Sequence, residues 1–365
     1  MKIYKFITQI SIAGCMLVGT PMLQGCMDNS LNDPLGKVSE EELGRDGFAA
    51  NAFFLTLCDY AYPIATENIY NTNESLIGDC YGRYQVMATD KFKGANFATY
   101  NAPENWLNWQ FADDNVMVLT YGAWNKIKNV TQGTGVNFAW AQILRIATMH
   151  RMLDMYGALP YSQISSDKLS APYDTMEEAY HAMFTDLTDA INVMTVYVTE
   201  NPNNRTMAKY DKVYDGDFEK WVKFANSLKL RMAIRIRFAD REYARQMAEE
   251  AINHSIGVIT SNEDNATSLG TKNQLYTVLV QWPDQCVSAD ITSYMKGYND
   301  PRMSKYFKKK TSDKGDDDYV GMRAGLSYGN DITGPTFSRI NVGEMDRTLW
   351  MSAAETAVSY THLTL

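Results

Sequence analysis

The most regular hydrophobic pattern in the chain lies between residues 136 and 162. Apolar side chains recur there at three- and four-residue spacing and so share one helix face: Ala139, Ile143, Ile146, Met149, Leu153 and Tyr156. A second apolar strip lies beside the first, at Trp140, Leu144 and Ala147. Because two strips need cover on both sides, the pattern predicts a long buried helix inside an array of helical repeats. Gly157 is expected to end it with a left-handed cap, and Pro160 prevents its continuation.

Further helices are predicted on both sides of this segment. Their expected ranges are 39–58, 116–130, 175–194, 217–238 and 242–254, with a last helix that begins near Leu349. Thr175 with Glu178 has the pattern of a capping box, and Asp217 is a good N-cap. Residues 62–112 and 308–346 are rich in turn-forming residues and predict loops. The segment LYTVLVQW, residues 275–282, has strand-like composition.

The helices at 116–130 and 136–156 are joined by a short glycine-containing turn. Such a hairpin resembles one tetratricopeptide unit, although the sequence has no strict repeat period. The chain has 34 basic and 43 acidic residues and a net charge of −9, which makes general binding of nucleic acid unfavourable. Aromatic residues make up 12% of the chain, and most aromatic side chains serve cores.

The N-terminus has the pattern of a bacterial lipoprotein. Lys2 and Lys5 precede a mostly apolar run, and Leu23-Gln24-Gly25-Cys26 follows it. The run is short and is interrupted by polar residues, which argues against a transmembrane helix. We therefore predict a signal peptide at 1–25, lipid attachment at Cys26 and stable anchoring through its acyl chains. Cys15 fits a similar cleavage site, but too little apolar sequence precedes it.

Residues 26–38 are polar and predict a tether between the lipid and the folded domain. Three further cysteines follow, Cys58, Cys80 and Cys286, and we interpret them as buried apolar side chains. A Cys58–Cys80 disulfide stays open as an alternative. No cysteine or histidine spacing predicts a metal site, and no cofactor is expected.

Two long motifs and part of a third resemble one known family. The segments AQILRIATMHRMLDMYGALPYS and DFEKWVKFANSLKLRMAIR resemble the conserved helices of the SusD/RagB family, and RTLWMSAAETA resembles the start of its next helix. The resemblance implies a mainly α fold, a tetratricopeptide-like array of helical pairs with long loops, over residues 39–357. Residues 358–365 fit nothing in the family, so we expect an incomplete domain with a non-native tail.

The resemblance also implies a function. Members of this family are outer-membrane lipoproteins on the cell surface, which bind glycans and deliver them to a partner TonB-dependent transporter without altering them. Capture of peptides is the first alternative, a surface glycoside hydrolase the second, and a purely structural envelope protein the third. Carboxylates are too numerous for the sequence to exclude a hydrolase, because the separation of a catalytic pair is spatial.

Other motifs do not support catalysis. Residues 325–329 match G-x-S-x-G, but neither a buried strand nor a helix flanks them. The acidic run at 313–318 lacks the alternating ligand spacing of a calcium loop. The chain is therefore predicted not to be an enzyme.

The candidate ligand-binding residues are aromatic and amide side chains in an expected surface loop. Flat rings can cover the C–H faces of sugars, and amides match hydroxyl groups. The candidates are Tyr100, Asn105, Trp106, Trp109 and Trp282. Packing of Trp106 and Trp109 beneath the loop stays open as an alternative. Trp124, Trp140 and Trp221 lie on apolar helix strips and are predicted to be core residues.

Overall fold

A computed structural model gives the fold of most of the chain. It describes residues 48–62, 67–89, 99–111, 116–164, 170–269, 274–282, 284–310, 318–326, 337–342 and 347–364. From Ala50 onward the described elements belong to one compact unit. Within the described residues, no helix has the length and apolar character needed to cross a membrane.

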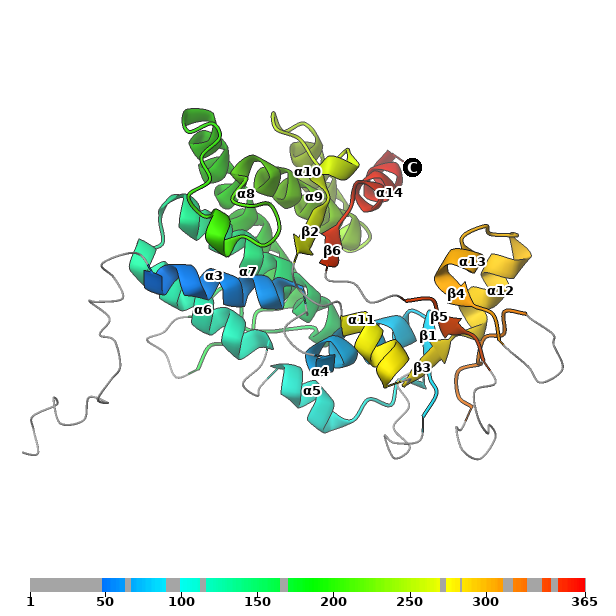
Figure 1. The fold of residues 1–365 in the computed structure, drawn as a ribbon. Helices are drawn as coiled ribbons and strands as arrows, with labels where there is room; N and C mark the ends of the chain where they lie inside the picture. Colours follow the sequence, from blue (N-terminus) through cyan, green and yellow to red (C-terminus); the bar gives the residue numbers. More distant parts are fainter. Residues whose placement is uncertain are drawn as a thin grey trace, which may run out of the picture. The chain divides into compact units, whose positions relative to one another are not determined.

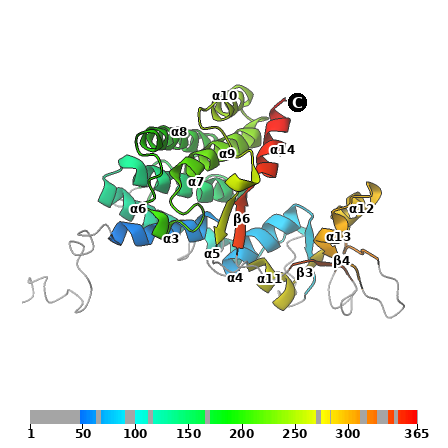
Figure 2. The ribbon, with the colours of Figure 1, turned by 45° about the horizontal axis from the view of Figure 1, so that its top comes forward.

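The main body is a row of antiparallel helices (Figures 1 and 2). Its helices are α3 (Phe48–Ala61), α6 (Val116–Thr131), α7 (Gly135–Tyr156), α8 (Met176–Glu200), α9 (Phe218–Ile236), α10 (Arg241–Ile252) and α14 (Ala353–Thr364). Each of the helices from α6 to α10 packs against the next one in the sequence, and α14 packs against α9. This arrangement confirms the predicted array of helical pairs.

Helix α7 is the centre of the core. Its residues from Ala139 to His150 are all buried, as the two apolar strips predict. Trp140 stacks on Phe54 of α3 with ring centroids 4.4 Å apart, and its ring lies 5.6 Å from that of Trp221 on α9. Trp140 and Trp221 are both fully buried, which confirms them as core residues. Each such aromatic contact adds about 0.5–1.5 kcal/mol beyond the burial of apolar area.

The ends of the helices follow the predicted chemistry. Thr175 and Glu178 form the complete capping box of α8, and the side chain of Asp217 accepts hydrogen bonds from two backbone N–H groups of α9. Gly157 ends α7 at φ 78° and ψ −141°. This glycine has the positive φ that was expected, but its ψ lies outside the left-handed helical region, so the chain leaves α7 extended.

The remaining elements are short and form a second region of the unit. Its helical segments are α4 (Glu67–Tyr70), the π-helix η2 (Asn71–Asp79), α5 (Glu104–Phe111), α11 (Gln274–Tyr276), the π-helix η6 (Thr277–Gln281), α12 (Ala289–Gly297) and α13 (Met303–Tyr306). Two 3-10 turns, η4 (Ala208–Tyr210) and η5 (Asn262–Asp264), lie beside the main helices.

Within the residues that the structure describes, the strands form three antiparallel pairs. They are β1 (Gln85–Met87) with β3 (Gln285–Val287), β2 (Ala266–Leu269) with β6 (Arg347–Met351), and β4 (Phe307–Lys308) with β5 (Arg339–Ile340). In the first pair, Val86 lies opposite Cys286. The strands of the first pair are about 200 residues apart in the sequence. The second pair packs on the main core through Ala266, Trp350 and Met351, whereas two small apolar clusters cover the other two pairs. One contains Cys80, Val86, Cys286 and Met322, and the other Val287, Met295, Met303 and Phe307.

Several local predictions were wrong. The segment NTNESLIGD was expected in a loop and is the π-helix η2, while LYTVLVQW was expected as a strand and is helical in α11 and η6. Two polar residues of η2 find hydrogen-bond partners far along the chain: Ser75 donates to Gln285 at 2.5 Å and Asn71 donates to Asp284 at 3.2 Å. Long-range contacts therefore override local propensity here.

Three other predictions are corrected or confirmed by the structure. Residues 104–109 lie in helix α5 and not in a loop. The last helix was predicted to begin near Leu349, but Leu349 lies in strand β6. The helix follows that strand and includes residues 358–364. Cys58, Cys80 and Cys286 are free and buried, which confirms the apolar interpretation and excludes the Cys58–Cys80 disulfide.

Candidate functional site

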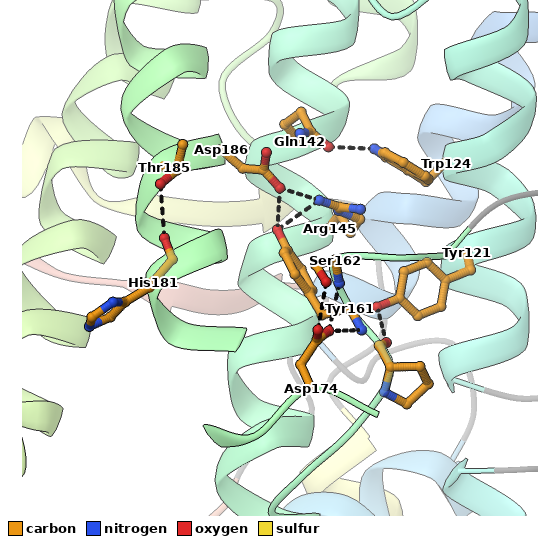
Figure 3. Close-up of polar contacts among 11 residues, drawn as sticks. Tyr121, Trp124, Gln142, Arg145, Tyr161, Ser162, Asp174, His181, Thr185 and Asp186 are labelled. Atoms are coloured by element: carbon orange, nitrogen blue, oxygen red, sulfur yellow. Dashed lines mark hydrogen bonds and ion pairs between the residues drawn. The ribbon is translucent and has the colours of Figure 1, made fainter. Parts of the chain in front are cut away.

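The motif at the end of α7 takes part in a polar cluster, which we call the signature cluster (Arg145, Tyr161, Ser162, Asp174 and Asp186; Figure 3). The guanidinium of Arg145 donates to the Tyr161 hydroxyl at 2.7 Å and to Asp186 at 2.5 Å. It lies between the rings of Trp124 and Tyr161, at 4.1 and 4.2 Å from their centroids. Arg145 is only 3% exposed, so it ties α7 to α8 and is not available to a ligand.

The segment after α7 is fixed by the same cluster. Asp174 accepts hydrogen bonds from the backbone of Tyr161 and Ser162 and from the Ser162 hydroxyl at 2.5–2.8 Å. Burial alone would raise the pKa of Asp174, but these hydrogen bonds outweigh it and hold the pKa below its ordinary value. Tyr121 of α6 donates to the Pro160 carbonyl at 2.8 Å. The motif is therefore explained by folding and not by catalysis.

A different surface has the features of a binding site. A cavity of about 540 Å³ lies between the turn before β1 and helices α12 and α13. Four tyrosines line it, together with two arginines and two aspartates: Tyr84, Tyr294, Tyr298, Tyr306, Arg83, Arg302, Asp290 and Asp300. We call this surface the tyrosine groove.

The rings of the groove are unusually open to solvent. Tyr84 is 55% exposed, Tyr294 68%, Tyr298 81% and Tyr306 47%. Isolated exposed aromatic residues are common on protein surfaces, but several exposed rings along one cavity indicate a ligand-binding surface.

Local sequence explains how these rings come together. Ser288 caps α12 by accepting from the backbone N–H of Asp290 at 3.1 Å. Asp290, Tyr294 and Tyr298 follow at four-residue spacing, so they share one helix face. Met295 on another face is buried in the small cluster under the helix. The tyrosines are thus presented by an anchored helix and not by a free loop.

One carboxylate of the groove, that of Asp300, suits hydrogen bonding better than proton transfer. Arg302 contacts Asp300 through two nitrogens, at 2.5 and 2.9 Å. These hydrogen bonds lower the pKa of Asp300 to about 2. A glycosidase needs one carboxylic acid with a raised pKa to protonate the leaving group. Asp300 is ionised at neutral pH and cannot serve as that acid.

A pair of tyrosines extends the polar and aromatic surface. Tyr100 and Tyr81 lie with ring centroids 5.0 Å apart, and the guanidinium of Arg83 lies 5.7 Å from the Tyr100 ring. Tyr100 is 63% exposed, so its predicted position on the surface agrees with the structure. Tyr81 also lines a smaller cavity of about 280 Å³ beside Glu74 and Arg151, which form an ion pair.

Asn105, Trp106 and Trp282 are not among the residues that line the tyrosine groove. Asn105 is exposed on α5, whereas Trp106 is half-buried and packs against the cluster that contains Cys80. Trp109 belongs to α5, but its side chain lies outside the described residues. Trp282 is half-buried at the end of η6. Cys26 also lies outside the described residues, so its role stays a prediction.

Sequence reasoning missed the four tyrosines of the groove. The four-residue spacing of Tyr294 and Tyr298 was a visible signal, but Tyr84 joins them only through the fold. Among the described residues, one group of three potential metal ligands was found, Glu177 with His181 and Asp240, and it lies away from the groove on α8 and before α10.

Comparisons with known proteins agree with this architecture. Residues 30–360 match the model of the SusD-like family, described as SusD and RagB outer membrane lipoproteins. A SusD homologue from Bacteroides uniformis is 35% identical, with a TM-score of 0.77 over 87% of this chain and 66% of that one. A chitin-binding SusD homologue from Flavobacterium johnsoniae is 31% identical, with a TM-score of 0.75 over 85% of this chain and 64% of that one.

A SusD-like protein from Bacteroides thetaiotaomicron is 32% identical, with a TM-score of 0.74 over 85% of this chain and 64% of that one. The chain thus spans just under two thirds of the length of these solved relatives. A search of curated proteins gave no match. The family match covers most of the sequence and the solved relatives share its fold, so the chain belongs to the SusD-like family of outer-membrane proteins.

Proposed function

We propose that this protein binds carbohydrate in the tyrosine groove and passes it on unaltered. The observation that carries the proposal is the set of four exposed tyrosine rings along one cavity of about 540 Å³. Family membership supports it, as does a relative that is described as chitin-binding.

The chemistry of the groove matches that of a sugar chain. A pyranose ring has apolar C–H faces that pack on flat aromatic rings, while its hydroxyl groups donate to carboxylates and accept from arginine. Tyr294 and Tyr298 supply rings, and Asp290 and Arg83 supply an acceptor and a donor nearby. The cavity lies within the usual size range of ligand sites.

Binding without chemistry is favoured by the electrostatics. Asp300, with its pKa lowered to about 2, can accept hydrogen bonds from sugar hydroxyls but cannot donate a proton at neutral pH. The proposal therefore predicts no new reducing ends when labelled glycans are incubated with the protein. Release of shorter products would favour the hydrolase alternative instead.

The cellular setting is also part of the proposal. Attachment through a lipid on Cys26 rests on the sequence before that residue, and the family description as outer membrane lipoproteins supports it. Delivery to a TonB-dependent transporter rests on the family resemblance. Globomycin treatment or a Cys26→Ser change should block cleavage before Cys26, so that the uncleaved precursor accumulates and the mature lipoprotein is lost. The transporter should co-purify with the intact lipoprotein.

The ligand class is tested by isothermal titration calorimetry. Chitin oligosaccharides are the first probes, followed by other neutral oligosaccharides and by an oligopeptide pool. The proposal expects heat from at least one oligosaccharide and none from the peptides. Binding of the peptide pool alone would assign the protein to peptide capture.

A further inference from the structure

Three side chains with metal-binding chemistry meet at the junction of α8 and α10, away from the tyrosine groove. Glu177 and His181 lie four residues apart on α8, so both face the same side of the helix. Asp240 comes from the turn before α10. One ligand atom from each of the three residues lies within 4.8 Å of the others.

The first turn of α10 holds two of these groups in place. The ring of His181 packs against that of Tyr243 with centroids 4.1 Å apart. One carboxylate oxygen of Asp240 accepts from the Tyr243 backbone at 3.3 Å, and the other lies 3.1 Å from Nε2 of His181. In Figure 3 the imidazole of His181 points away from the signature cluster, so it does not belong to that network.

The charge around the group favours a cation. In the part of the chain that the structure describes, neither Glu177 nor Asp240 forms an ion pair with lysine or arginine, and the side chain that contacts the Asp240 carboxylate is His181. The nearby Arg235 is engaged by Asp154 at 2.9 Å. Two carboxylates this close repel each other, and a bound cation would remove that repulsion.

There is room for the remaining ligands of an ion. The three residues line a cavity of about 350 Å³ whose wall includes Tyr180, Ile236 and Ala239. Neighbouring ligands in a tetrahedral site with bonds of 2.0–2.1 Å lie about 3.3 Å apart. The separation of 3.1 Å between His181 and Asp240 is close to that value, and exposed Glu177 can rotate to complete the set.

We infer that Glu177, His181 and Asp240 form a site for a divalent transition-metal ion, of which Zn²⁺ is the best match. One imidazole and two carboxylates suit zinc, whereas calcium takes six to eight oxygen ligands. The ion would join α8 to the turn between α9 and α10, and its fourth position would face the cavity. The site is independent of carbohydrate binding in the groove.

The test uses the purified chain without a histidine tag, after dialysis against a chelator. Titration with ZnCl₂ should give one site per chain, and Zn²⁺ should raise the melting temperature. His181→Ala and Glu177→Gln should each weaken zinc affinity at least about tenfold, because even the mutation of a residue that only orients a metal ligand lowers metal affinity by about that factor. Both changes lie at half-buried or exposed positions and leave the core intact.

His254→Ala is the matched control, because His254 is a half-buried histidine that contacts Thr195 and belongs to no group of metal ligands among the described residues. This variant should keep full zinc affinity and the thermal shift. The inference is overturned if the parent protein binds no zinc, or if His181→Ala and Glu177→Gln bind it as tightly as His254→Ala does.

Discussion

Replacing Asp186 with asparagine tests how the signature cluster holds the helices together. The change keeps the shape of the side chain but removes the charge that faces Arg145 at 2.5 Å. Removing one partner of a buried ion pair usually costs about 3–5 kcal/mol, because the other charge stays buried and unpaired. The side chain of Arg145 is 4% exposed but that of Asp186 is 31% exposed. Water can therefore reach part of the site, and we expect a loss of about 2–3 kcal/mol.

This loss is measured by equilibrium unfolding in urea at pH 7. It corresponds to a fall in melting temperature of roughly 3–4 °C, because the unfolding entropy of about 2.1 cal/mol/K per residue is large for a chain of 365 residues. Asp189→Asn is the matched control, because Asp189 is exposed on the same helix and its loss should change stability by less than about 0.5 kcal/mol. A double-mutant cycle with Arg145→Met should give a coupling energy of at least about 1 kcal/mol. Equal stabilities for Asp186→Asn and Asp189→Asn would refute this role for the cluster.

Two further predictions concern stability. Burial, with a smaller effect of Arg231, lowers the pKa of His150 to about 4, below the value of about 6.5 in an unfolded chain. Neutral His150 therefore contributes its full share of stability above pH 6.5, and this share is lost as the pH falls toward 4. The parent protein should lose about 2 kcal/mol of unfolding free energy between pH 7 and pH 5 through this residue, and His150→Gln should abolish that part of the loss. Trp106→Ala should lower stability by about 1–2 kcal/mol, because its half-buried ring packs on the cluster around Cys80. The exposed Asn105→Ala serves as its control in urea unfolding, and an unchanged midpoint for Trp106→Ala would return that ring to the ligand candidates.

The long helices could be predicted because their patterns are local. In α7 the apolar residues repeat on two strips, and both strips are buried in the structure. The caps at Thr175 and Asp217 depend on neighbouring residues only and were also predicted. By contrast, η2 is rich in polar side chains, and its Ser75 is paired with Gln285, about 200 residues away. Local patterns contain no information about such a partner.

The candidate site was less predictable for the same reason. Tyr100 was identified because it stands among amides and rings, and it is exposed beside Tyr81. Trp106 has similar neighbours in the sequence, but helix α5 turns its ring toward a small core. The groove joins Tyr84 to Tyr298, and long-range contacts such as the pairing of β1 with β3 bring those parts of the chain together.

Carbohydrate binding in the tyrosine groove is tested by calorimetric titration of groove variants with an oligosaccharide that binds the parent protein. Tyr294→Ala and Tyr298→Ala each remove an exposed ring from the groove, whereas Tyr173→Ala removes a ring that is 59% exposed elsewhere. Each groove variant should bind the oligosaccharide about tenfold more weakly, a loss of about 1.4 kcal/mol, with an unchanged melting temperature. Tyr173→Ala should bind as the parent does. Full affinity in both groove variants would contradict carbohydrate binding at this surface.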